Sequence, residues 1–242
     1  HSMKNVDIIH SRDLVYADFG RYDTVFNFAI SPEMKFDSYR SRYDLDVETG
    51  KLAMQNGCHY VMMSTRKVYG GHTELESFTE ESPLDPYDHY SENKMISEQR
   101  LTSFGENVTI LRGSNIFGFE YGRQSFMGYC MTQLKDYGIV TYEYDPELKR
   151  DFIDIDTVCK VLKKVVEVKP KGIYNLSSNT GLEVGNVTKY LIKGYGEGKI
   201  VVSSQEVEEQ FILDNSKLEK ALNINIGPFD FDNIIYELGK KL

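Results

Sequence analysis

Short, nearly continuous apolar runs alternate along the first half of the chain with longer segments in which apolar residues recur at helical spacing. Continuous apolar runs of this kind are typical of buried parallel strands. We expect such strands at 5–10, 23–30, 58–64 and 107–113. Helices are predicted between them at 38–56, where Gly57 supplies a stop, and at 90–104, where Ser91 offers a capping side chain. This alternation predicts βαβ units, and therefore a parallel sheet.

Beyond Gly118 the pattern loosens, and the expected elements follow one another less regularly. They are a helix at 124–136, a strand at 139–144, a strand running into an amphipathic helix over 150–167, a strand at 172–177, a helix at 184–196, a strand at 199–204 and a terminal helix at 231–242. Right-handed crossovers would place helices on both faces of the sheet. The fold class is therefore predicted to be α/β, with a smaller lobe built from the later residues beside the sheet.

Composition restricts the kind of protein this can be. The chain has 242 residues, 40% hydrophobic and 27% charged, which is ordinary for a globular protein. A net charge of −9 argues against a nucleic-acid partner, and no apolar run approaches the length of a membrane span. Cys58, Cys130 and Cys159 match neither a disulfide framework nor a zinc pattern, so we expect a reducing, cytoplasmic setting and no metal.

Tyr90 and Lys94 stand four residues apart in a predicted helix, so both side chains project from one face. A free phenol is a weak base at neutral pH, but an ammonium group a few ångströms away stabilises the phenolate. The same lysine can hydrogen-bond a ribose. Ser64 and Thr65 end a predicted parallel strand, and ligands of open α/β sheets bind at the carboxyl ends of the strands. A hydroxyl there can assist the phenolate or the reacting alcohol.

A purely structural interpretation of these residues also exists. Tyr90 could pack on the stem of Lys94 at the surface, and the two hydroxyl residues could simply be polar residues at the end of a strand. The order along the chain favours the catalytic interpretation. A hydroxyl pair at a strand end is followed, 25 residues after Thr65, by Tyr-x-x-x-Lys at the start of a helix and then by another strand.

Several longer segments carry a resemblance to a known family. They are DTVFNFA, STRKVYG, PLDPYDHYSENK, VTILRGSNIFG, KRDFIDIDTV and GIYNLSS, in this order. The chain resembles the extended short-chain dehydrogenase/reductases, specifically the NAD-dependent sugar-nucleotide epimerases and dehydratases, which are isomerases and oxidoreductases. The resemblance covers about 20–190, with a weaker echo at 213–222.

The resemblance implies a role for individual residues. Tyr90 would be the general base, Lys94 its cationic partner and ribose ligand, and Thr65 the assisting hydroxyl. The implied cofactor-binding residues are Ala29, Ser64, Tyr90, Lys94, Gly113 and Ser114. On the substrate side, Asn115 and Arg150 would contact the diphosphate of a nucleotide sugar. For Arg150 a guanidinium fork suits that role, although a turn residue and a surface charge are the simpler interpretations of these two positions.

The chain also departs from the family. Family members open with a strand, a Gly-rich turn and a helix that hold the pyrophosphate of the dinucleotide, whereas Gly20 is the one glycine between Met3 and Tyr22. The glycine cluster at 194–198 follows a helix and is expected to be a loop. The chain thus resembles a member that lacks its first βαβ unit. The strand at 23–30 would then have an open edge, which 5–10 or a partner chain could fill.

The implied fold is a truncated Rossmann-like parallel sheet with helices on both faces and a small C-terminal substrate lobe. The incomplete dinucleotide-binding domain would comprise 3–115 plus 150–178, and the substrate-binding lobe 116–149 plus 179–242.

The predicted function is that of an NAD- or NADP-dependent epimerase or 4-keto reductase acting on a nucleotide-diphosphate sugar, in a cytoplasmic protein and possible homodimer. Dehydratase activity is disfavoured because Arg66-Lys67 replaces the Asp-Glu pair of the 4,6-dehydratases. The alternative is a cofactor-deficient paralogue or fragment that binds a sugar nucleotide or a partner subunit without turnover, with the dinucleotide weakly bound or absent.

Overall fold

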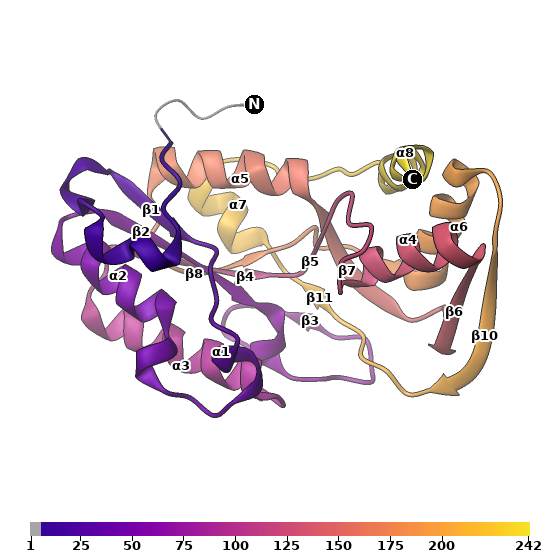
Figure 1. Ribbon diagram of the computed structural model, residues 1–242, viewed down its shortest axis with the longest axis horizontal. Helices are drawn as coiled ribbons and strands as arrows, with labels where there is room; N and C mark the ends of the chain where they lie inside the picture. Colours follow the sequence, from indigo (N-terminus) through magenta and orange to yellow (C-terminus); the bar gives the residue numbers. More distant parts are fainter. Residues whose placement is uncertain (1–5) are drawn as a thin grey trace.

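A four-stranded parallel sheet forms the centre of the protein, whose computed structural model describes residues 6–242 (Figure 1). Its strands are β1 (Thr24–Asn27), β2 (His59–Thr65), β4 (Val108–Gly113) and β8 (Gly172–Leu176), and they lie in the order β1-β2-β4-β8. Tyr60 of β2 is paired with Val25 on one side and Val108 on the other. The predicted α/β class and parallel sheet are confirmed.

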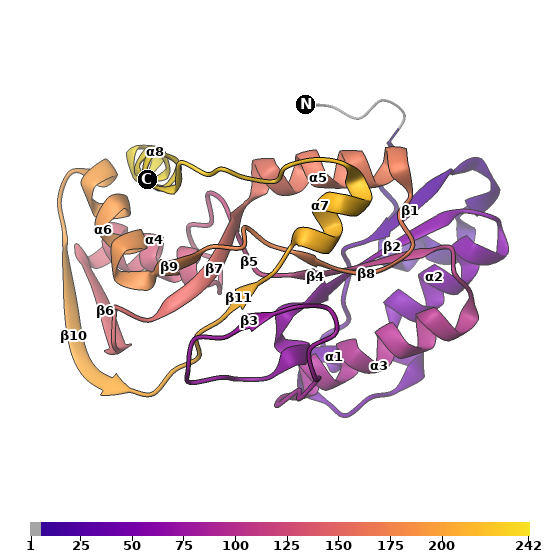
Figure 2. The same cartoon turned by 180° about the vertical axis from the view of Figure 1, so that it is seen from behind.

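Helices cover both faces of this sheet (Figures 1 and 2). One face carries α2 (Leu45–Gln55) and α3 (His89–Phe104), and the other carries α5 (Ile155–Val168) and α7 (Ser216–Leu222). The alternation of side chains along β2 divides the two cores: Tyr60 and Met62 pack on the first face, and Val61 on the second.

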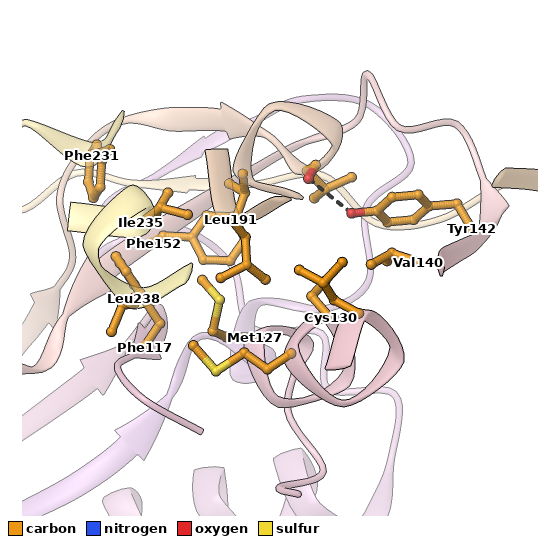
Figure 3. Close-up of a cluster of buried hydrophobic side chains, with 14 residues drawn as sticks. Phe117, Met127, Cys130, Val140, Tyr142, Phe152, Leu191, Phe231, Ile235 and Leu238 are labelled. Atoms are coloured by element: carbon orange, nitrogen blue, oxygen red, sulfur yellow. Dashed lines mark hydrogen bonds between the residues drawn. The ribbon is translucent and has the colours of Figure 1, made fainter. Parts of the chain in front are cut away.

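A second group of elements extends from one end of the sheet. Its strands are β5 (Asn115–Phe117), β6 (Ile139–Tyr144), β7 (Lys149–Asp154), β9 (Gly181–Glu183) and β10 (Lys199–Glu206), and its helices are α4 (Phe126–Tyr137), α6 (Val184–Tyr195) and α8 (Phe231–Lys241). Their shared core includes Met127, Phe152 and Leu191 (Figure 3). Gly194 lets α6 approach α8 closely, because a Cβ atom there would collide with the carbonyl oxygen of Tyr236.

Short elements complete the described chain. They are α1 (Glu33–Phe36), the 3₁₀ turns at Ser11–Tyr16, Phe19–Arg21, Ser41–Tyr43 and Arg66–Tyr69, and the small parallel pair of β3 (Ser77–Phe78) with β11 (Ile212–Leu213). After β11 the chain returns to the sheet, where Leu218 and Leu222 of α7 pack against its core. The division of the chain into two domains stays a prediction.

Two expected elements differ from the structure. The strand predicted at 5–10 is wrong over residues 6–10, which pair with no strand of the described chain and leave Ile8 86% exposed; Asn5 lies outside the described residues. An apolar run becomes a strand only where a neighbour pairs with it. The helix predicted at 38–56 begins only at Leu45, because the side chain of Asp44 accepts a hydrogen bond from the backbone N–H of Val47 and caps it there.

Candidate functional site

A cavity of about 480 Å³ opens at the carboxyl ends of β1, β2 and β4. The first turns of α3 and one face of α5 complete its wall, the latter with Ile155, Val158, Cys159 and Leu162. Parallel strands bring their carboxyl ends to the same edge of a sheet, so residues far apart in the sequence meet there.

Most of the site residues predicted from the sequence lie in the wall of this one cavity. They are Ala29, Ser64, Thr65, Tyr90, Lys94, Gly113 and Ser114. The two predicted substrate ligands are not among the residues that line the cavity: Asn115, at the start of β5, stands between the lining residues Ser114 and Ile116, and Arg150 lies in β7. The structure therefore groups the predicted catalytic and cofactor residues and places Asn115 next to them in the chain.

The helix that carries Tyr90 and Lys94 starts from a well-defined cap. The Oδ1 atom of Asp88 accepts a hydrogen bond from the backbone N–H of Ser91 at 2.7 Å, and the backbone N–H of Asp88 donates to the hydroxyl of Ser91 at 3.2 Å. Ser91 thus belongs to a capping box whose N-cap is Asp88. Burial tends to raise the pKa of Asp88, but hydrogen bonds from Ser91 and Lys67 outweigh it and lower this pKa.

Lys94 is buried and forms an ion pair inside the protein. Its Nζ atom lies 2.6 Å from Oδ2 of Asp46 and also donates to the carbonyl oxygen of Met63 at 2.9 Å. An ammonium group has three N–H donors, so one remains for a ligand in the cavity. Asp46 also accepts a hydrogen bond from the amide of Asn27 at 2.8 Å.

Asp46 and Asn27 were not predicted as site residues. Asn27 offered a signal, since it is a polar residue inside the apolar run of 23–30. Asp46 stands among other polar residues of its helix, where nothing local distinguishes it.

The two hydroxyl residues at the end of β2 have different partners. Ser64 donates to Oε1 of Glu98 at 2.5 Å, so its hydroxyl is directed toward the polar face of α3. The Oγ1 atom of Thr65 accepts a hydrogen bond from the backbone N–H of Lys67 at 3.2 Å, which leaves its O–H able to donate. Thr65 is thus the hydroxyl better placed to contact a ligand, and its role as the assisting hydroxyl stays a prediction.

A buried ion pair joins α3 to the middle of the sheet. The guanidinium of Arg112 in β4 contacts Oε2 of Glu98 at 2.7 Å, and both side chains are at most 3% exposed. Arg112 also donates to the hydroxyl of Tyr69 at 3.0 Å, which in turn donates to Asn175 at 2.7 Å. Burial raises the pKa of Tyr69 to about 12 in spite of the neighbouring guanidinium, so this phenol stays protonated and serves as a structural hydrogen-bond donor.

Arg150 faces the segment that joins β10 to β11. Its Nε atom donates to the carbonyl oxygen of Glu209 at 3.1 Å, and its guanidinium lies 3.6 Å from the carboxylate of Glu208. The guanidinium also lies over the ring of Tyr144, 5.2 Å from the ring centre. Arg150 is 9% exposed. It is therefore a buried cation with acidic neighbours.

Within residues 6–242, no three His, Cys, Asp or Glu side chains come together in a way that could hold a metal ion. The helices in the same range are too short or too polar to cross a bilayer.

Comparison with known proteins defines the class. Residues 5–177 match the NAD dependent epimerase/dehydratase family, and the chain belongs to this family. The family membership predicted from the sequence is confirmed. The family uses NAD, and the carboxyl ends of the strands in an open α/β sheet are where such a ligand binds.

Particular relatives can be named within this class. UDP-arabinose 4-epimerase 1 of Arabidopsis thaliana is 29% identical over an alignment of 259 positions, which covers 86% of this chain and 61% of the plant protein. The chain thus spans about three fifths of the length of that relative.

Solved structures show the same fold. The UDP-N-acetylglucosamine 4-epimerase of Methanobrevibacter ruminantium M1, in complex with UDP-N-acetylmuramic acid, has a TM-score of 0.78 at 17% identity and covers 94% of this chain and 80% of its own. The dTDP-glucose 4,6-dehydratase of Bacillus anthracis str. Ames, in complex with NAD, has a TM-score of 0.74 at 21% identity, with coverages of 91% and 72%.

Proposed function

We propose that the protein is an NAD-dependent epimerase or 4-keto reductase that acts on a nucleotide-diphosphate sugar. The observation that carries the proposal is the convergence of Thr65, Tyr90 and Lys94 in the wall of one cavity. These three residues come from the end of a strand and the start of a helix, where the family resemblance assigns a hydroxyl, a base and a cation. The UDP-sugar enzymes among the structural relatives support a nucleotide sugar as the substrate class.

In the proposed mechanism each residue has a separate task. Tyr90 accepts the proton of a sugar hydroxyl, and the ammonium of Lys94 stabilises the resulting phenolate. Thr65 donates a hydrogen bond that orients the reacting alcohol. When bound, NAD supplies the hydride acceptor and donor at its nicotinamide ring. An epimerase leaves the oxidation level of the sugar unchanged, whereas a 4-keto reductase lowers it, and Tyr90 would then donate its proton to the oxygen of the sugar ketone.

The cavity residues fit the nicotinamide and ribose end of the dinucleotide. Ser114 lines the cavity, and its buried Oγ atom has no hydrogen-bond partner among the described residues. Lys94 keeps one N–H donor free, as a ribose ligand requires. Between residues 6 and 23 the structure has two 3₁₀ turns and no strand followed by a Gly-rich turn and helix. The residues of the cavity thus support binding of the nicotinamide and ribose end of NAD or NADP.

The same absence favours a second candidate function. In it the chain is a cofactor-deficient relative that binds a sugar nucleotide or a partner subunit without turnover. The edge position of β1 supports this alternative, because strands of a dinucleotide-binding sheet normally continue on that side.

Epimerase or reductase activity is favoured over dehydration. Arg66 and Lys67 follow Thr65 where a 4,6-dehydratase carries an acidic pair, and both are engaged in ion pairs, with Glu209 and Asp88 respectively. Two paired cations cannot act as an acid and a base.

The proposed division of labour keeps the two predicted domains, although β7 pairs with β5 and β9 of the second group of elements and α7 packs on the central sheet. The sheet part, 3–115 plus 150–178, would hold the cofactor end, and the lobe of 116–149 plus 179–242 the sugar nucleotide. A homodimer is part of the proposal on family grounds alone.

The proposal is tested by titrating the purified chain with NAD(H) and NADP(H), and by following a panel of UDP-, dTDP-, GDP- and CDP-sugars by NMR. We expect dinucleotide binding and turnover of one panel member, and a loss of about 10²-fold or more for Tyr90→Phe, the range of general-base contributions. Tyr137→Phe is the matched control, because that phenol is 68% exposed and lies outside the cavity lining; its activity should equal that of the unmodified chain.

The outcome separates the two candidates. No dinucleotide binding at millimolar concentration, together with binding of a sugar nucleotide, would establish the non-catalytic alternative for this chain. Adding a βαβ segment from a complete relative would then restore Tyr90-dependent turnover if the catalytic residues are correctly placed.

A further inference from the structure

Residues 6–10, which we term the arm, form an apolar segment that pairs with no strand of the described chain. The arm lies beside the end of α5 and leads away from the molecule (Figure 1), and His10 at its base has an extended backbone. Its apolar side chains are exposed to solvent: Val6 by 59%, Ile8 by 86% and Ile9 by 40%. Leaving such side chains in water is unfavourable, so the arm is suited to bind an apolar partner.

An anchored segment separates the arm from β1 of its own chain. Leu14 and Phe19 are buried in the core that contains Tyr60 and Val47, on the face covered by α2. This part of the chain is therefore held in place, and the arm leaves it without reaching the outer edge of β1. The five residues of the arm stay available for pairing with another chain.

The outer edge of β1 lacks a partner in the same way. Within residues 6–242, β1 pairs with β2 alone. Phe28, just beyond β1, is 67% exposed and stacks on Phe26 at a ring-centre distance of 6.0 Å. The Oγ1 atom of Thr24 is buried and has no hydrogen-bond partner among the described residues. An extended segment can bind such an edge through main-chain hydrogen bonds.

The apolar and polar positions of the arm match those of β1 in one antiparallel register. In that register each apolar side chain lies opposite an apolar one and each polar side chain opposite a polar one. The pairs are Val6–Phe28, Asp7–Asn27, Ile8–Phe26, Ile9–Val25 and His10–Thr24. Directly opposite side chains share a face of the sheet, and aromatic side chains pair favourably with β-branched ones.

The match is specific to this register. A slip by one residue places Asp7 opposite Phe28, or opposite Phe26 when the slip is in the other direction. Either slip also moves every side chain of the arm to the other face of the sheet. In the matched register His10 lies opposite Thr24, where its ring can hydrogen-bond the unpartnered hydroxyl.

We propose that two copies of the chain exchange their arms, so that each arm adds an antiparallel strand to β1 of the other copy. Each copy carries both the arm and the free edge, so a two-fold exchange pairs both elements in both copies and closes the assembly. The added strand ends opposite Phe28, which lines the cavity. Val6 of the partner subunit then lies at the rim of that cavity. The exchange goes beyond the proposed function and does not depend on it.

Disulfide trapping between copies tests the register. Single variants His10→Cys and Thr24→Cys are prepared in a Cys159→Ser background, because Cys159 is exposed whereas Cys58 and Cys130 are buried. We expect the oxidised mixture of the two variants to give a covalent dimer, because directly opposite residues satisfy disulfide geometry, and we expect little dimer from either variant alone.

A mixture of His10→Cys with Phe28→Cys is the matched control for this experiment. Phe28 is four residues farther along the chain, about 13 Å from the position of Thr24 in an extended strand, so this mixture should give little covalent dimer. No dimer from the first mixture, or as much from the control mixture, would overturn the proposal.

Ile8→Lys tests the arm without a cross-link. We expect the dissociation constant of the dimer, measured by sedimentation, to rise at least ten-fold, because a charge replaces the side chain opposite Phe26. Val207→Lys makes a similar change at another aliphatic position, which is 79% exposed, and should stay within two-fold of the unmodified chain. A chain that remains monomeric at all concentrations, or an Ile8→Lys variant that associates as tightly as the unmodified chain, would also exclude the exchange.

Neither measurement requires NAD or turnover, so the two proposals can fail separately. A chain without turnover whose first mixture cross-links keeps the arm exchange and loses the proposed function. A chain with Tyr90-dependent turnover whose mixtures give no specific cross-link has the opposite result.

Discussion

At the scale of single residues, the ion pair of Lys94 with Asp46 is the least expected feature of the site. The family resemblance implied that Lys94 is the cationic partner of Tyr90 and a ribose ligand. In the structure the carboxylate of Asp46 lies 2.6 Å from its ammonium, and both side chains are at most 7% exposed. The ammonium of Lys94 therefore already has a carboxylate partner inside the protein.

Removing one member of this pair should be costly for stability. We expect Asp46→Ala to lower the free energy of unfolding by about 3 kcal/mol, because it leaves an uncompensated buried ammonium. The double variant Asp46→Ala with Lys94→Met should recover part of that loss, since no charge is left unpaired. Urea unfolding followed by circular dichroism measures both, and a double variant less stable than Asp46→Ala would contradict this account.

Site residues could be predicted from the sequence where their spacing alone fixes their relative positions. Tyr90, Lys94 and Thr65 were identified because a four-residue spacing and a strand end have a fixed geometric meaning. Asp46 was not, because its partner is 48 residues away in the sequence. Only folding brings the two together.

At the scale of elements, α3 is unusual because the face that it buries is mostly polar. Its buried residues are Ser91, Asn93, Lys94, Ser97, Glu98 and Leu101, all but one of them polar. Hydrogen bonds and ion pairs with neighbouring elements therefore hold this helix, in place of an apolar stripe. Its limits lie close to the predicted 90–104, but the face it buries could not be predicted from a hydrophobic period.

The buried ion pair of Glu98 with Arg112 should hold α3 against the sheet. We expect Glu98→Gln to lower the free energy of unfolding by about 3 kcal/mol, because it leaves a buried guanidinium without its counter-charge. Glu92→Gln makes the same substitution on the exposed side of α3 and should change stability by less than about 0.5 kcal/mol. Chemical unfolding of the two variants measures both changes. Equal losses of unfolding free energy would show that the buried pair stabilises the protein no more than an exposed carboxylate does.

At the scale of the whole molecule, the free edge of β1 is the feature with the widest consequence. In the described part of the chain β1 pairs with β2 alone, and its outer edge has no neighbouring strand. Phe28 follows this strand and is 67% exposed, stacked at 6.0 Å on Phe26. Unpaired edges beside exposed apolar side chains favour association with other chains.

The free edge predicts self-association that depends on Phe28. We expect the chain to associate with rising concentration, and Phe28→Lys to reduce this association, since a lysine beside an edge strand opposes pairing. Phe104→Lys makes the same change of charge at the end of α3, where the side chain is 43% exposed, and should have little effect. Light scattering over a concentration series compares the three proteins; an equal reduction by both variants would attribute the association to charge or general hydrophobicity.

The sequence by itself determined the α/β class, the order and approximate limits of the central strands, and the position of the Tyr90–Lys94 pair. Each of these depends on spacing within a few residues, through the periods of strands and helices and the stops at glycine. It also predicted a strand before β1 that does not form in the described residues, because an apolar run alone cannot supply a partner.

Tertiary structure alone decided which charges meet. The pairing of Arg66 with Glu209 joins residues 143 positions apart, and the pairing of Lys94 with Asp46 likewise depends on how α2 and α3 pack on the sheet. The same packing determined that Ser64 turns toward Glu98 and that β1 lies at the edge. Contacts between distant segments are set by how whole elements pack, and no local pattern of residues records them.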